Sequence, residues 1–196
     1  MKMSVILFCA LLLLAGSGAT AASAISAEAR YRELVMVVDR NAGHAHFTRG
    51  MNSYTIMELQ NAVGESDIPV LQKMLGDKDR IVVMTTVNVL MRMSAQGRRA
   101  VYETLLTTDR KESRNTIAEQ LSDLPNDMTL KARIPGWTDD ITFLKRMAEN
   151  RDLRTIWAAR DLLKAMGEPG QAAIREILAT TKNQRTREML KGEAGR

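Results

Sequence analysis

The chain has 196 residues, of which 45% are hydrophobic and only 4% aromatic, and its formal net charge is +5. A single cysteine excludes a disulfide framework within the chain. The sequence also lacks G-x-S-x-G, H-E-x-x-H and phosphate-binding glycine motifs, so no enzyme class is indicated. Abundant aliphatic residues without alternating β-branched stretches favour an all-α fold.

An export signal is predicted at the N-terminus. Lys2 precedes an almost unbroken apolar run over residues 5–15, followed by small and polar residues. A membrane-spanning helix needs ~20 apolar residues, so a signal peptide over 1–24, cleaved after Ala24 or Ala21, is favoured over an uncleaved anchor. The only cysteine lies inside this segment. We therefore expect a periplasmic or secreted protein with no cysteine and no nucleic-acid partner.

Residues 25–64 are expected to form an atypical N-terminal helix pair, in which Gly64 ends the second helix. His44 and His46 lie in the loop between the two helices. An H-x-H pair in an extended segment points both rings the same way and can supply two ligands to zinc or copper. Two ligands do not make a site, so no metal or other cofactor is predicted, and this pair is the only metal candidate.

A pattern of two helices recurs four times after residue 64. In the first copy a helix begins at Asp67 and ends at Gly76, and a second runs from Arg80 to about Met93 with apolar residues at i, i+4 and i+7. The arginines that open the second helices, Arg80, Arg114, Arg154 and Arg187, are 34, 40 and 33 residues apart. This period is typical of stacked helix pairs, and the longer middle step indicates an insertion.

The pattern resembles the HEAT-like repeats, in which an acidic turn precedes the arginine, and a small residue and a leucine follow one and two turns later. The matching residues are Asp152-Leu153-Arg154 with Ala158 and Leu162, and Asp77-Lys78-Asp79-Arg80. Met84 departs from the pattern, because it replaces the small residue in the first copy. The resemblance covers about residues 65–191. It implies a right-handed α-solenoid domain over 25–191, with about five antiparallel helix pairs and a flexible tail over 192–196.

The four recurrent arginines admit two interpretations. Guanidinium groups on successive repeats could bind carboxylates or phosphates on a partner. In this repeat type, however, such an arginine usually contacts the acid of the preceding turn or a carbonyl of a neighbouring repeat. A structural role for Arg80, Arg114, Arg154 and Arg187 is therefore predicted.

The segment from Pro125 to Trp137 is the predicted insertion, and we expect a loop there. It carries Lys131 and Arg133 and ends at Trp137, and insertions in repeat proteins often lie on the binding face. A tryptophan beside two cations would make a protein-contact anchor. Alternatively, Trp137 packs on the following helix and the loop merely spans a gap.

These features together predict a non-enzymatic scaffold or adaptor that binds another protein in the periplasm or cell envelope, through a concave helical surface and the inserted loop. Two alternatives stay open: a copper or zinc binder using His44 and His46, and a peripheral binder of an anionic envelope surface. Some HEAT-like proteins are lyases, and that resemblance supplies a less favoured enzyme alternative.

Overall fold

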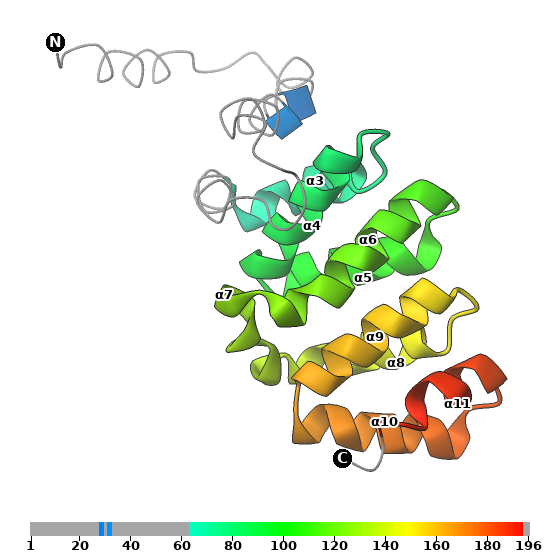
Figure 1. The fold of residues 1–196 in the computed structure, drawn as a ribbon. Coiled ribbons are helices and arrows are strands. Elements are labelled where there is room, and N and C mark those ends of the chain that lie inside the picture. Colours follow the sequence, from blue (N-terminus) through cyan, green and yellow to red (C-terminus); the bar gives the residue numbers. More distant parts are fainter. Residues whose placement is uncertain (1–27, 30, 33–62, 194–196) are drawn as a thin grey trace, which may run out of the picture.

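A computed structural model describes residues 28, 29, 31, 32 and 63–193, and all the regular elements in this part of the chain are helices (Figure 1). The predicted all-α class is therefore confirmed. No helix among these residues is long and apolar enough to cross a bilayer. The predicted signal peptide over 1–24, the histidines His44 and His46, and most of the predicted N-terminal pair lie outside the described residues.

The described chain begins its continuous part with a 3-10 turn and then forms long helices joined by short turns. The long helices are α3 (Ile68–Met74), α4 (Arg80–Met93), α5 (Ala95–Thr107), α6 (Lys111–Asp123), α8 (Ile141–Ala148), α9 (Leu153–Ala165), α10 (Glu168–Thr180) and α11 (Gln184–Leu190). The short helical turns are η2 (Glu65–Asp67), η3 (Leu124–Asn126), α7 (Met128–Lys131), η4 (Ile134–Gly136) and η5 (Thr138–Asp140).

These helices form a stack of pairs in two layers. Helices α3, α5, α8 and α10 contact one another in chain order and form one layer, while α4, α6, α9 and α11 form the other (Figure 1). Hydrogen bonds join side chains 32 residues apart in successive pairs: Asn88 Nδ2 donates to Gln120 Oε1 at 2.9 Å, and Thr181 Oγ1 to Glu149 Oε2 at 2.9 Å. These bonds connect adjacent pairs within each layer.

The second-layer helices begin at a recurring polar turn. Asp79 accepts a hydrogen bond from the Ile81 amide, Asp152 from the Thr155 amide, and Asn183 from two amides, so each satisfies backbone donors that the first helical turn leaves free. Arg110 precedes α6 without a side-chain cap. Counted from these four residues, the helix starts are 31, 42 and 31 residues apart, which places the predicted insertion between α6 and α8.

Two glycines allow close crossings between consecutive helices. A Cβ atom on Gly97 of α5 would lie 2.5 Å from the Leu90 carbonyl oxygen of α4, and one on Gly170 of α10 would lie 1.8 Å from the Leu163 carbonyl oxygen of α9. Both glycines follow the residue they cross by seven positions. Only a residue without a side chain permits this backbone approach. The same crossing therefore recurs at two connections between pairs.

The core runs continuously between the two layers. Leu90 and Leu162, which the sequence predicts on apolar stripes, are both buried. The prediction of a single apolar face is incomplete for α4, because Val82, Thr86 and Val89 are buried as well. Helix α4 contacts α3, α5 and α6 and is therefore enclosed over most of its circumference.

Four described residues precede residue 63, and they adopt helical conformation against α3. Tyr31 is buried in the common core, and Lys73 pairs with Glu28 at 2.7 Å. Arg32 forms an ion pair with Asp77 in the turn before α4. These contacts attach the upstream segment to the first complete pair of the stack.

Candidate functional site

The second layer of helices carries an exposed apolar patch on α9. Trp157 is 42% exposed and Leu153, one helical turn earlier, is 41% exposed, and they are the large hydrophobic side chains that the described chain leaves open to solvent. Residues four apart lie on the same face of a helix, so the two side chains form one patch. Apolar patches that stay exposed on a folded protein often mark interaction sites.

A shallow groove between α6 and α9 adjoins this patch. Its lining residues are Ala118, Glu119, Ser122, Asp123, Arg154 and Trp157. One edge of Trp157 is held in place, because its indole Nε1 donates to the Met189 sulfur of α11 at 3.2 Å. The groove thus combines the Trp157 ring and the Arg154 guanidinium on α9 with a mostly polar wall on α6.

Glu119 connects three successive helices at the surface of the second layer. Its carboxylate pairs with Arg80 of α4 at 2.8 Å and with Arg154 of α9 at 2.5 Å. All three side chains are partly exposed, and ion pairs open to water contribute about 0–1 kcal/mol each to stability. This bridge therefore orients the Arg154 guanidinium at the groove more than it stabilises the fold.

The other two recurrent arginines act differently. Arg114 donates to the Thr108 carbonyl oxygen at 3.2 Å, and Arg187 donates to the Thr181 carbonyl oxygen at 2.7 Å, in each case six residues back along the chain. Arg114 and Arg187 are each the fourth residue of their helix, whereas Arg80 is the first residue of α4 and Arg154 the second of α9. The prediction that all four occupy one repeat position is therefore wrong, because the arginine spacing does not follow the spacing of the helix starts.

The exposed bridge leads to a prediction for Arg154. We expect Arg154→Ala to lower the free energy of unfolding by less than about 1 kcal/mol, because its partner Glu119 stays solvated when the pair is broken. Urea denaturation followed by circular dichroism measures this change, with Lys111→Ala as a control for loss of a surface cation. A loss above about 2 kcal/mol would show that the bridge stabilises the stack substantially.

The inserted segment is not a loop but a series of short helical turns, whose side chains Leu130 and Ile134 are fully buried. Trp137 is also in the core, with 5% of its surface exposed, so the prediction of Trp137 as a contact anchor is wrong for this structure. The Arg98 guanidinium lies 4.7 Å from the centre of its ring. Lys131 and Arg133 are exposed, and Arg133 donates to the Arg92 carbonyl oxygen at 3.3 Å.

A buried ion pair holds the end of the insertion. Asp140 is completely buried and binds Arg98 of α5 through two contacts, of 2.5 Å and 3.3 Å. The Tyr102 hydroxyl donates to the same carboxylate at 3.1 Å. Burial, and next the Asp140 charge, raise the pKa of Tyr102 well above 10, which keeps this hydroxyl protonated as a donor. The cluster satisfies its own charges internally and has no open face for a substrate.

A second buried arginine holds the beginning of the insertion. Arg92 of α4 pairs with Asp127 and donates to Asn88 Oδ1 at 2.8 Å. Burial is the main cause that lowers the pKa of Arg92 from its ordinary value, and the Asp127 charge opposes this effect. Arg92 and Arg98 flank the turn between α4 and α5, so this turn fixes both ends of the insertion. Sequence reasoning missed both pairs, because each joins residues 35 or more positions apart.

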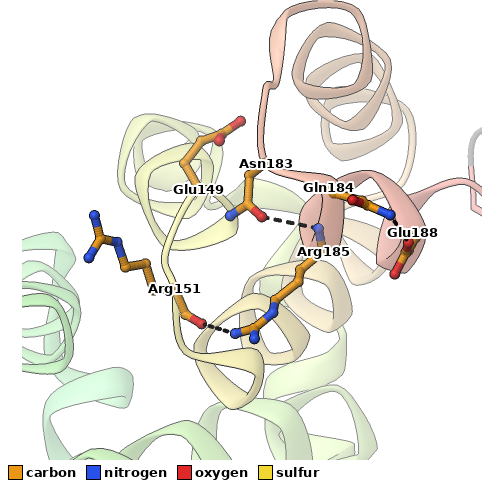
Figure 2. Close-up of a pocket in the computed structure, with 6 residues that line it drawn as sticks. All are labelled: Glu149, Arg151, Asn183, Gln184, Arg185 and Glu188. Atoms are coloured by element: carbon orange, nitrogen blue, oxygen red, sulfur yellow. Dashed lines mark hydrogen bonds between the residues drawn. The ribbon is translucent and has the colours of Figure 1, made fainter.

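A more open and more polar hollow lies between the turn before α9 and the turn before α11 (Figure 2). Its lining residues are Glu149, Arg151, Asn183, Gln184, Arg185 and Glu188. Arg185 donates to the Arg151 carbonyl oxygen at 3.2 Å, and Asn183 donates to the Asn150 carbonyl oxygen at 3.0 Å. These bonds are structural, since they join the turn before α11 to the turn before α9.

Within the described residues, no group of three or more histidine, cysteine, aspartate or glutamate side chains is placed to hold a metal ion. The candidates His44 and His46 lie outside this part of the chain, so metal binding by this pair stays an alternative that the described residues do not test.

The chain was compared with protein-family models, curated proteins and solved structures. None of the three comparisons found a match. The function is therefore inferred from the chemistry of the α6/α9 groove and its exposed tryptophan.

Proposed function

We propose that this protein is a non-enzymatic adaptor of the periplasm or cell envelope, which binds a segment of another protein in the groove between α6 and α9. The proposal includes a cleaved signal peptide over 1–24 and a right-handed solenoid of HEAT-like repeats. The single observation that carries it is the exposure of Trp157 beside Leu153 on a helix that is otherwise well packed.

The chemistry of the groove supports protein binding. Tryptophan and arginine are the residues most often responsible for binding energy at protein interfaces, and here Trp157 and Arg154 line the same groove. Both are oriented before binding, Trp157 by Met189 and Arg154 by Glu119. Contacts fixed in advance reduce the conformational entropy lost on association. The groove is shallow and mixed in polarity, which suits a peptide segment better than a small molecule.

Photo-crosslinking in the native host tests this proposal. A photo-reactive residue at Ser122, in the groove, is expected to capture a defined protein, whereas one at the exposed Glu103 on the opposite layer is not. We expect Trp157→Ala to weaken capture from Ser122 by roughly 30-fold, which corresponds to a loss of about 2 kcal/mol at a central tryptophan.

The stability of the variant separates binding from folding. Trp157 is substantially exposed, so Trp157→Ala is expected to retain the thermal unfolding midpoint of the parent protein within a few degrees. Equal capture from Ser122 and Glu103, or capture that is unchanged in Trp157→Ala, would overturn the groove as the binding site. A probe at Trp137 would report only on the interior.

A further inference from the structure

The turns that lead from a helix of the first layer to the second-layer helix of the same pair form a basic edge along one side of the stack. These turns precede α4, α6, α9 and α11, and Figure 1 shows all four on the same side of the molecule. We call this surface the turn edge. Its cationic residues are Lys78, Arg80, Arg110, Lys111, Arg114, Arg151, Arg154, Lys182, Arg185 and Arg187. Adjacent turns touch, since Arg110 donates to the Gly76 carbonyl and Arg185 to the Arg151 carbonyl.

Most of these cations form no ion pair with a carboxylate that the structure describes. Arg80 and Arg154 share the single carboxylate of Glu119. Four more arginines donate to backbone carbonyls, which carry no net charge: Arg110, Arg114, Arg185 and Arg187. The side chains of Lys78, Lys111, Arg151 and Lys182 are exposed and make no ion pair with any residue that the structure describes.

Several acidic residues of the same turns are engaged within the fold, whereas Asp109 and Glu112 beside α6 are exposed. Asp79 and Asp152 cap helices by accepting from backbone amides, Asp77 pairs with Arg32, and Glu149 accepts from the Thr181 hydroxyl. The last turn, residues 182–187, contains three cations and no acid. The excess of positive charge is therefore greatest beside α11.

The geometry of Arg151 shows how this edge could receive a ligand. Figure 2 shows its guanidinium extended away from Arg185, which reaches back to the Arg151 backbone instead of competing for the same space. Planar guanidinium groups bind carboxylates through two parallel hydrogen bonds. Packed helices are about 8–10 Å apart, which equals about three residues of extended chain at about 3.1–3.3 Å per residue. Carboxylates along an extended peptide can thus meet cations on successive turns.

We propose that the turn edge binds an acidic, extended segment of the partner protein. This inference rests on the proposed function, because it identifies the chemistry of the segment that continues from the α6/α9 groove. Arg154 makes this continuity possible, since it belongs both to the groove and to the turn edge. Complementary charge on such an edge accelerates association and makes binding sensitive to salt.

A binding assay with a defined probe tests the inference. Fluorescence anisotropy of a labelled hexaglutamate peptide is measured against the purified full chain, the double variant Arg151→Glu/Lys182→Glu, and the matched double variant Arg99→Glu/Lys131→Glu. Arg99 and Lys131 are exposed cations outside the turn edge, so both variants change the net charge equally. We expect the turn-edge variant to bind roughly tenfold more weakly and the matched variant to differ less than twofold from the parent, with all binding weakened by salt.

Three outcomes would overturn the inference: no binding of hexaglutamate at low salt, equal weakening in the two double variants, or turn-edge binding to anionic lipid vesicles without binding to the peptide. The crosslinking experiment distinguishes this failure from failure of the proposed function. If Ser122 still captures its protein and Arg151→Glu/Lys182→Glu leaves that capture unchanged, the adaptor function stands and the acidic segment is wrong. If the double variant reduces capture but Arg99→Glu/Lys131→Glu does not, both proposals are supported.

Discussion

Asp140→Ala is expected to lower the free energy of unfolding by about 3–5 kcal/mol, because it leaves the buried guanidinium of Arg98 without its counter-ion. The same change removes the acceptor of the Tyr102 hydroxyl, which is also buried. Urea denaturation monitored by far-ultraviolet circular dichroism measures the effect. Because folded proteins have only a small margin of stability, we expect the variant to be largely unfolded at 37 °C even without urea.

The neighbouring residue provides the control. Asp139 is exposed one position before Asp140 in the same helical turn, so Asp139→Ala should change the free energy of unfolding by no more than about 0.5 kcal/mol. Equal midpoints for the two variants would mean that the Arg98 charge finds water or another partner when Asp140 is absent. Such a result would contradict the assignment of this ion pair as the anchor of the insertion.

Gly170→Ala is expected to destabilise the protein by about 3 kcal/mol or more, at or above the upper end of the usual cost of overpacking. The new methyl group would lie 1.8 Å from the Leu163 carbonyl oxygen, and backbone cannot move aside as the end of a flexible side chain can. Relief of the clash requires α10 to move away from α9, which reduces contact over the whole helix pair. The thermal unfolding midpoint and the urea midpoint should both decrease.

A graded series tests this explanation. Gly97→Ala places its methyl group 2.5 Å from the Leu90 carbonyl oxygen, so a smaller loss than in Gly170→Ala is expected, while Gly136→Ala meets no atom within 4 Å and should be nearly neutral. If the three variants were equally stable, the close crossings would not limit the approach of the helices. Loss in Gly136→Ala alone would point instead to the conformation of the insertion.

Much of the helical pattern is present in the sequence because it depends on local chemistry. Asp79 and the apolar period after it predict a helix over Arg80–Met93, and the structure has those limits. The same holds for the interruption after α6, which the longer arginine spacing indicates. The form of the insertion could not be predicted in this way, because its short turns depend on Asp127 and Asp140 meeting arginines that are distant in the chain.

The candidate site was less predictable, since it depends on which of two tryptophans the packing leaves open. Trp137 has the neighbours of a surface anchor, yet the Arg98 guanidinium covers its ring and the core encloses it. Trp157 lies inside a helix whose other large apolar side chains are mostly buried, yet it lines the groove and remains 42% exposed. Hydrophobic patterning cannot distinguish these cases, because the exposure of each tryptophan depends on how neighbouring helix pairs pack against it.

Hydrogen bonds between neighbouring pairs join residues about 32 positions apart in the sequence, and this separation has a consequence for the order of folding. The extensive contacts of every long helix lie within its own pair or an adjacent pair, so little chain entropy is lost in closing distant loops. A molecule of such low contact order should fold rapidly, and its ends should open without its centre. Hydrogen exchange should then be fastest in α11 and slowest in α4 and α6, and proteolysis should begin at the C-terminal pair while the middle pairs stay intact.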